Sequence, residues 1–384
     1  MTNKQSKIEK LVAELCPNGV EFKSIGEICQ IKRGRVMSKD YLKDNAGKYP
    51  VYSSQTADNG IFGRINTYDY DGEYLTWTTD GAYAGSIFYR KGKFSITNVC
   101  GLLKAKSDDV NMKFLSYILA TVSKNYVSSG MGNPKIMSNV MEKIKIPLPP
   151  IAIQKEIVKI LDSFTELEAD LEAELEARKK QYEYYREELL THNDEARMAV
   201  LGKVLKRTKG TPITAGQMSK LNREGAPIKI FAGGKTVAYV NYGDIPDKDV
   251  LTKESVVVKS RGIIAFEYID KPFSHKNEFW SYYSNDPDIN IKYIYYYLKN
   301  KELYFQTIGQ KMSKMPQLSI PNTDKFQIPI PSLPKQERIV SILDKFDALV
   351  NDISIGLPAE ILARKQQYEY YRGKLLTFKE YAKQ

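Results

Sequence analysis

The sequence predicts an α+β fold that uses one plan twice: two similar strand-rich globular modules and two long helices that pair as an antiparallel coiled coil. The first observation is an internal repeat, because residues 146–190 and 328–376 share a long series of matching residues. The second is the stretch before each repeat, where short runs rich in Tyr, Thr, Val and Ile alternate with glycine turns. The third is an apolar spacing of four and three residues inside the repeats, which is typical of coiled coils.

The duplication divides the chain into four parts. Each copy of the repeat opens with Ile-Pro-x-Pro, continues through an Ile-Val-x-Ile-Leu-Asp run and closes with Gln-Tyr-Glu-Tyr-Tyr-Arg. We therefore expect a first module over residues 1–147, a first helix over 148–190, a second module over 191–329 and a second helix over 330–384.

The repeat helices carry a narrow apolar seam, so each favours a partner helix, and its twin is the nearest candidate. The alternative is a solvated helix that packs only on its own module. The expected seam positions, which would also serve partner binding, are Ile157, Ile160, Phe164, Leu167, Leu171, Tyr182 and Tyr185 in the first helix, and Ile339, Ile342, Phe346, Leu349, Tyr368 and Tyr371 in the second.

The second helix departs from the first in one place. It has four more residues between Leu349 and Arg364 than the first helix has between Leu167 and Arg178. Gly356-Leu357-Pro358 lies in this insertion. It should break or kink the second helix, because proline lacks a backbone donor and clashes with the preceding turn.

Within the first module, residues 7–15 predict an amphipathic helix that Pro17-Asn18-Gly19 ends, and residues 112–121 predict another helix. Three dipeptides between them are hairpin signals: Asn59-Gly60, Asp71-Gly72 and Asp80-Gly81. The second module repeats the plan with far less identity. We expect Pro227-Ile228 to correspond to Pro50-Val51, Ser260-Arg261-Gly262 to Thr79-Asp80-Gly81, and Met315-Pro316-Gln317 to Asn133-Pro134-Lys135.

The chain has a net charge of +11, and its two modules carry equal excesses of positive charge. Residues 1–150 and residues 191–332 each carry 21 Lys and Arg against 14 Asp and Glu, whereas residues 151–190 carry 6 against 11. Two equally basic modules indicate that both contact one polyanion. The sequence lacks a long apolar run and a signal-peptide core, and its three cysteines lack ligand spacing, so we expect a cytoplasmic protein with free thiols.

Motifs for catalysis are missing from the sequence. Gly233-Gly234-Lys235-Thr236 resembles the end of a phosphate-binding loop, but Lys229 stands where that motif needs glycine. The two histidines, His192 and His275, have no Cys or carboxylate at zinc-ligand spacing. The sequence therefore predicts a non-catalytic protein that binds no metal or cofactor.

Basic residues interleave with aromatic residues in the loops of both modules. Lys and Arg would hold phosphates, whereas Asn, Gln and Arg would read base edges. His275 is equally well explained as ordinary loop surface. The candidates for DNA binding are Lys32, Arg33, Arg35, Thr79, Tyr83, Asn133 and Lys135 in the first module, and Lys206, Arg207, Lys209, Arg261, His275, Lys276, Lys311, Lys314 and Gln317 in the second.

Together, these motifs resemble the specificity subunit of type I DNA restriction-modification systems over essentially the whole chain. The resemblance is carried by the repeat motifs above, by Gln154 and Gln336 near the helix starts, and by Asp80-Gly81-Ala82 with Ala84-Gly85. It implies two target recognition domains, each reading one half of a bipartite double-stranded DNA sequence. It also implies that the helices act as a spacer and dock two methyltransferase subunits, and through them restriction subunits. S-adenosylmethionine, ATP and Mg would then bind only to those partners.

Two other functions remain open from the residues themselves. A structural coiled-coil scaffold would explain the helices, but not two modules of matched positive charge. The DNA-binding part of a methyltransferase or endonuclease of another type would explain the charge, but it requires the motifs that are missing. Binding to a bipartite DNA duplex separates a scaffold from a DNA reader.

Overall fold

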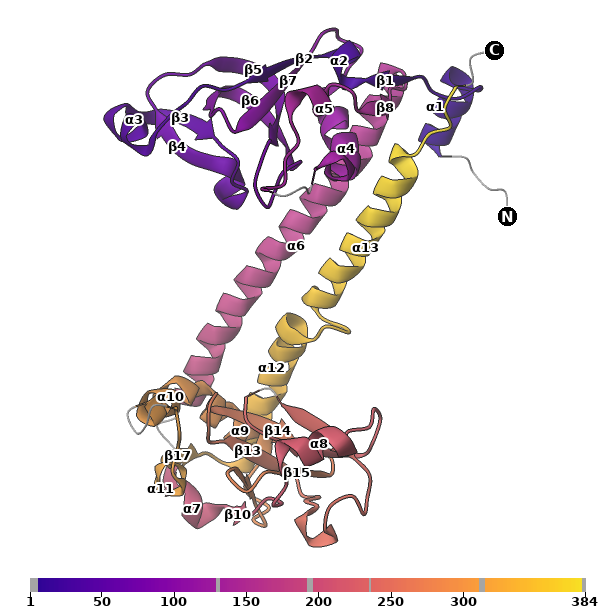
Figure 1. The fold of residues 1–384 in the computed structure, drawn as a ribbon. Helices are drawn as coiled ribbons and strands as arrows, with labels where there is room; N and C mark the ends of the chain where they lie inside the picture. Colours follow the sequence, from indigo (N-terminus) through magenta and orange to yellow (C-terminus); the bar gives the residue numbers. More distant parts are fainter. Residues whose placement is uncertain (1–5, 129–131, 192–195, 235, 311–314, 382–384) are drawn as a thin grey trace. The chain divides into compact units, whose positions relative to one another are not determined.

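A computed structural model describes residues 6–128, 132–191, 196–234, 236–310 and 315–381 of the chain (Figure 1). The chain divides into two compact units. Unit 1 comprises Met1–Asp170 and Leu362–Gln384, and unit 2 comprises Leu171–Ile361. Each unit holds one strand-rich module, the start of the helix that follows it and the end of the other repeat helix. The α+β fold class and the internal repeat are confirmed.

The module of unit 1 is built on a six-stranded sheet of order β2-β7-β5-β6-β3-β4. Neighbouring strands are antiparallel except β3 and β6, which are parallel. The strands are β1 Phe22–Ser24, β2 Cys29–Arg33, β3 Ala46–Tyr52, β4 Ile61–Ile65, β5 Tyr70–Thr78, β6 Ile87–Ile96, β7 Cys100–Ala105 and β8 Lys145–Pro147. The helices are α1 Lys7–Leu15, α2 Ile25–Ile28, α3 Lys39–Asp44, α4 Met112–Val122 and α5 Ser138–Met141, with short 3-10 turns η1 Ala57–Gly60 and η2 Ser123–Tyr126.

The module of unit 2 has the same connectivity in two sheets, β10-β16-β13-β14 and β12-β11-β15. Its β14 and β15 correspond to the single strand β6 of unit 1. The break falls at Asp270-Lys271-Pro272, where proline cannot donate to a strand ladder. The strands are β9 Arg197–Val200, β10 Lys206–Thr208, β11 Ile228–Phe231, β12 Val237–Val240, β13 Ser255–Lys259, β14 Ala265–Ile269, β15 Phe273–His275, β16 Trp280–Tyr283 and β17 Gln327–Ile330. The helices are α7 Leu201–Val204, α8 Ala215–Leu221, α9 Ile291–Asn300, α10 Glu302–Gln310 and α11 Ile320–Asp324, with the 3-10 turn η3 Asp247–Asp249.

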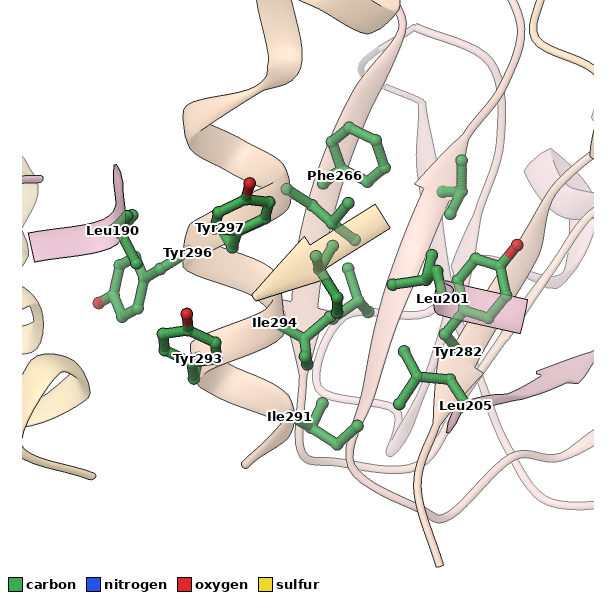
Figure 2. Packing of buried hydrophobic residues seen from close by; sticks show 14 of the residues in the cluster. Leu190, Leu201, Leu205, Phe266, Tyr282, Ile291, Tyr293, Ile294, Tyr296 and Tyr297 are labelled. Carbon is green, nitrogen blue, oxygen red and sulfur yellow. The ribbon is translucent and has the colours of Figure 1, made fainter. Parts of the chain in front are cut away.

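Side-chain caps fix where several helices begin. Ser6 and Glu9 form a reciprocal capping box at the start of α1, which confirms the predicted helix over residues 7–15. Asn111 caps α4, and Asn290 caps the corresponding α9. Each of these two helices packs one face on its sheet. Figure 2 shows Ile291 and Ile294 of α9 on the side of Leu201, Leu205 and Tyr282, within the core of unit 2.

The first repeat helix is one continuous element, α6 Ile151–Thr191. The second is interrupted over residues 352–356, which separate α12 Leu333–Asn351 from α13 Leu357–Leu376. Gly356 is required at this break, because a Cβ there would lie 2.3 Å from the carbonyl oxygen of Ala348. Pro358 does not itself break a helix. It occupies the first turn of α13, where its missing N–H costs no helical hydrogen bond.

Within each unit, the two helix segments run antiparallel and meet through aromatic rings. In unit 1, Phe164 lies 6.3 Å from Tyr368 and 5.6 Å from Tyr371 between ring centroids. In unit 2, Phe346 lies 6.0 Å from Tyr182 and 5.7 Å from Tyr185.

The remaining predicted seam positions divide into three groups. Leu171 packs with Leu357 and Ile361 in a small apolar cluster of unit 2. Ile157 and Ile339 point into the module cores instead, while Ile160 and Ile342 are half-buried. Leu167 and Leu349 expose more than a third of their surface, so their role in partner binding stays a prediction. Each helix packs against a module on one face and against the other repeat helix on a second face, so it buries two faces rather than a single seam.

Two other sequence expectations need correction. Asp71-Gly72 is not a turn, because both residues lie inside β5 opposite Lys93 and Gly92. Pro227-Ile228 does not match Pro50-Val51. Val51 pairs with Ser95 and Ile230 pairs with Ser274, so Ile230 is the counterpart of Val51. Side chains alternate between the two faces of a strand, so a shift of two residues in the alignment leaves the same face buried. The apolar pattern therefore does not distinguish the two alignments.

Candidate nucleic-acid interface

Each module is attached to its own helix by one buried glutamine. In unit 1, the Gln154 side chain accepts a hydrogen bond from the backbone N–H of Asn111 (2.9 Å) and donates to the carbonyls of Asp109 (2.8 Å) and Pro149 (2.7 Å). In unit 2, Gln336 repeats this pattern. It accepts from Asn290 (2.9 Å) and donates to the carbonyls of Asp288 (2.9 Å) and Pro331 (2.8 Å). We call these two sets of contacts the glutamine clamps.

An ion pair and a tyrosine reinforce each clamp about two turns further along the helix. Asp162 of α6 accepts from Lys113 and from the Tyr117 hydroxyl of α4, both at 2.6 Å. In unit 2, Asp344 of α12 accepts from Lys292 at 2.8 Å and from the Tyr296 hydroxyl at 2.5 Å. Burial and the adjacent carboxylate raise the pKa of both tyrosines, so they remain hydroxyl donors. Each module is thereby held rigidly on the start of its helix.

Four loops of the first module meet at the ends of the central strands. Residues 79–83 lie against residues 133–137 through a bridge between Asp80 and Lys135. The N–H of Gly81 donates to the carbonyl of Pro134 at 3.0 Å. Residues 33–35 lie against residues 97–99, where the Arg33 guanidinium donates to the carbonyl of Asn98 at 2.6 Å. We call these four segments the loop cluster of unit 1.

Unit 2 builds the same cluster on the same backbone contacts. Arg261 bridges to Gln317, and the N–H of Gly262 donates to the carbonyl of Pro316 at 2.9 Å. Thr211 bridges to Lys276 in the same way as Arg35 bridges to Thr97. The loop cluster of unit 2 therefore comprises residues 209–211, 260–263, 276–278 and 315–317. The correspondence of these turns with those of the first module is confirmed.

One glycine in each cluster permits a very close approach of two chain segments. A Cβ on Gly34 would lie 2.1 Å from the carbonyl oxygen of Ile96, and a Cβ on Gly210 would lie 2.0 Å from that of His275. Both contacts involve backbone atoms that cannot turn aside, so only glycine fits.

Comparison with known proteins now identifies the family. The family model described as type I restriction modification DNA specificity domain matches residues 17–177 and again 198–363. The chain belongs to this family of specificity subunits. A putative type I specificity subunit of Mycoplasma pneumoniae is 34% identical over 361 residues, which cover 92% of this chain and 96% of that protein. The specificity subunit of the type I restriction enzyme MpnII from the same organism is 43% identical over 185 residues, covering 47% of this chain and 55% of that protein.

Solved structures support the same fold. The specificity subunit of a type I restriction-modification system from M. genitalium aligns with a TM-score of 0.64 and 16% identity, over 93% of this chain and 96% of that one. The HsdS subunit from Thermoanaerobacter tengcongensis aligns with a TM-score of 0.52 and 17% identity, over 98% and 99%. The two modules are therefore the two target recognition domains of a specificity subunit, which is a non-catalytic subunit.

In the first recognition domain, most predicted contact residues lie in the loop cluster or beside it. Lys32, Arg35, Asn133 and Lys135 are exposed, and Tyr83 exposes 59% of its surface. Arg33 is half-buried and donates hydrogen bonds to the Asn98 carbonyl, so it stabilises the loop cluster and also adds positive charge to it.

In the second recognition domain, the candidates are more dispersed. Arg261 and Gln317 are exposed at the centre of the loop cluster. Lys276 is half-buried and pairs with Glu278 at 2.7 Å. Lys206 and Lys209 are exposed on or just after β10, whereas Arg207 pairs with Asp324 of α11 at 3.6 Å, outside the cluster. Lys311 and Lys314 lie outside the described residues.

Two predicted contact residues are buried and cannot meet DNA. The Thr79 hydroxyl is fully buried and donates to the carbonyl of Val99 at 2.9 Å. His275 is also fully buried at the end of β15, where burial lowers its pKa to about 4. Thr79 directly follows β5 and His275 ends β15, so the sequence placed both residues near the cluster but did not show that their side chains point inward. Asn98, whose carbonyl holds Arg33, was missed, because an asparagine in a loop carries no distinctive signal.

No group of His, Cys, Asp and Glu among the described residues could hold a metal ion. Cys29 and Cys100 are buried, and burial raises the pKa of each thiol to about 12, so neither is a ready nucleophile. Across the described ranges, no helix is long and apolar enough to cross a membrane.

Proposed function

We propose that this chain is the DNA-reading subunit of a type I restriction-modification complex. Each recognition domain reads one half of a bipartite double-stranded target through its loop cluster. The repeat helices dock two methyltransferase subunits, and through them restriction subunits. S-adenosylmethionine, ATP and Mg bind on those partners and not on this chain.

The observation that carries the proposal is that one backbone arrangement presents different side chains in the two domains. The bridge position held by Asp80 in the first cluster is held by Arg261 in the second, and Lys135 is replaced by Gln317. A carboxylate accepts hydrogen bonds from cytosine, whereas Arg favours guanine and Gln favours adenine. A shared frame with different base-edge chemistry is what two readers of two different half-sites need.

Charge supports contact with DNA in both domains. Residues 1–150 and 191–332 carry the same excess of basic residues, and exposed cations lie in or beside each cluster. Phosphate contacts by these cations would supply affinity, and the cluster side chains would supply sequence preference.

The repeat helices support the docking role because they are the part of the chain that is duplicated most closely. Their closing Gln-Tyr-Glu-Tyr-Tyr-Arg segments each leave a tyrosine more than 60% exposed, Tyr184 in unit 2 and Tyr370 in unit 1. Exposed aromatic side chains at equivalent places suit two copies of one partner. The three unpaired, buried cysteines suit a reducing compartment, so we place this complex in the cytoplasm.

The test is a domain exchange in the assembled methyltransferase. Residues 201–327 are replaced by the corresponding domain of a related specificity subunit, and the methylated motif is determined by sequencing. We expect one half of the motif to change and the other half to stay. Exchange of residues 22–145 is the matched control and should change the opposite half. A change in both halves after either exchange contradicts the proposal.

A further inference from the structure

The connection between β3 and β4 holds an unusual turn. Asp58 and Asn59 have φ of 47° and 49°, and Gly60 follows with φ of 79°. Asp58 and Asn59 are the only non-glycine residues with positive φ in the part of the chain that the structure describes. Asn and Asp visit this left-handed region as single residues, but a run of such residues is disfavoured. Both side chains are exposed, so burial of the side chains does not explain the strain.

A buried arginine holds this turn in place. Arg90 of β6 is 3% exposed and donates to the carbonyl of Asn59 at 2.8 Å and to the Thr76 hydroxyl at 3.1 Å. Its guanidinium lies 3.6 Å from the ring centroid of Tyr52 and 4.6 Å from that of Phe88. Among the described residues, no carboxylate pairs with it, and its Nη1 atom has no hydrogen-bond partner. Burying a cation without a carboxylate partner is costly, and the Asn59 carbonyl offsets part of this cost by accepting a hydrogen bond from the guanidinium.

The turn is continuous with the loop cluster of unit 1. Ser53, at the start of the same connection, accepts a hydrogen bond from the Thr97 hydroxyl at 2.9 Å. The N–H of Thr97 donates to the carbonyl of Tyr52 at 2.9 Å. Thr97 is the residue that bridges to Arg35, so the strained turn extends the cluster along the same edge of the domain.

The described part of the second recognition domain has neither the buried arginine nor the long strained turn. The strand register shows which residue matches Arg90. Arg90 pairs with Tyr74 of β5, and the residue of β13 that corresponds to Tyr74 is Ser255. Ser255 pairs with Ile269, so Ile269 occupies the position of Arg90. The connection between β11 and β12 is also shorter, spanning residues 232–236 in place of 53–60. The buried arginine and the long strained turn are therefore present together in one domain and absent together from the described part of the other.

From these observations we infer that the turn Asp58-Asn59-Gly60 is a base-reading element of the first recognition domain, with Arg90 as its positioning residue. This inference rests on the proposed function. The Asn59 amide presents a donor and an acceptor side by side, which matches the adenine edge in the major groove. Asp58 offers an acceptor for the amino group of cytosine. Strain of this kind persists where the surrounding structure enforces it for a task.

The decisive variant is Asn59→Gly, tested as the full chain assembled with its methyltransferase subunit. Glycine adopts a left-handed φ freely, so the turn should keep its shape while it loses the amide. We expect the melting temperature to stay equal or rise by a few degrees. We also expect the methylated motif to lose selectivity at one position of one half-site, by roughly tenfold or more for a lost bidentate contact.

Asn66→Gly is the matched control. Asn66 is exposed and lacks a positive φ, so this variant should not gain stability, and its motif should equal that of the unaltered complex. Arg90→Lys tests positioning, because lysine keeps the charge but loses the forked donor to the turn. It should relax the same position of the same half-site as Asn59→Gly.

The outcomes separate this inference from the proposed function. If the unaltered complex methylates no bipartite motif, the proposed function fails. If it does, and Asn59→Gly keeps full selectivity at every position, the turn does not read bases and the inference is wrong. A loss of selectivity in both half-sites, or a large fall in melting temperature with Asn59→Gly, would show a structural role and would also overturn it.

Discussion

The two recognition domains are alike where they meet the helices and different where they face solvent. Gln154 and Gln336 make the same three hydrogen bonds, with donor–acceptor distances that agree within 0.1 Å. The loop clusters share their backbone bridges but not their side chains, and among the described residues the turn held by Arg90 occurs in the first domain alone. The glutamine clamps tolerate little change, because every buried polar group in them needs a hydrogen-bond partner. Exposed loop positions carry no such requirement and can diverge.

The largest effect is expected at the glutamine clamps. Gln154→Ala removes a fully buried amide and leaves the N–H of Asn111 and two carbonyls without partners. We expect the free energy of unfolding to fall by about 3 kcal/mol. Gln336→Ala should cost a similar amount, since its contacts are the same. Both are measured by urea unfolding.

Gln30→Ala is the control for the clamps, because Gln30 is exposed on β2. It should change the free energy of unfolding by no more than about 0.5 kcal/mol. If one clamp variant were costly and the other harmless, the two attachments would not be equivalent despite their matching geometry.

A smaller effect, dependent on pH, should distinguish the second domain from the first. His275 is buried with its pKa lowered to about 4, so the unfolded chain, with an ordinary pKa near 6.5, binds the proton first. Its contribution to stability is therefore complete above about pH 6.5 and is lost as the pH falls toward 4. Between pH 7 and 5 we expect a loss of about 2 kcal/mol.

The first domain has Ile96 at the place of His275, because both residues end the strand that pairs in parallel with β3 or β11. His275→Ile should remove this acid sensitivity between pH 7 and 5, as followed by thermal unfolding of the second domain. An unchanged pH dependence in the variant would assign the effect to other groups.

The smallest effect concerns α1, which has no counterpart among the residues of unit 2 that the structure describes. Lys7 of α1 pairs with Glu156 of α6 at 2.6 Å, and Glu9 pairs with Lys374 of α13 at 3.7 Å. The repeat positions that match Glu156 and Lys374 are Arg338 and Glu188, so both charges are reversed in unit 2. The charges that pair with α1 occur in the unit that has this helix, and the opposite charges occur in the other unit. This difference indicates that Glu156 and Lys374 serve the docking of α1.

Glu156→Arg should therefore weaken α1 docking by up to about 1 kcal/mol at low salt, since the Lys7 side chain is mostly exposed. Lys7→Glu in the same chain should restore most of this loss. A double-mutant cycle measured by unfolding gives the coupling energy. Additive losses would show that the pair does not hold α1.

Much of the architecture could be predicted from short-range pattern. The duplication, the α1 and α4 helices and the long α6 follow from caps and apolar spacing within a few residues of one another. The break in the second helix was expected near Gly356, but its cause was misassigned. Pro358 starts α13, and the close approach of Gly356 to Ala348 ends the preceding segment.

Composition, repetition and local periodicity by themselves determined the α+β class and the doubling of the plan, and the repeat motifs carried the resemblance to the family. These properties depend on residues that are neighbours along the chain. Tertiary structure alone decided which candidate side chains reach solvent: it buried Thr79 and His275, paired Arg207 with Asp324, and set Arg90 beneath a turn some thirty residues away in sequence. The physical reason is that burial and hydrogen bonding at the end of a strand depend on which distant loop covers it, and a one-dimensional pattern records only the strand.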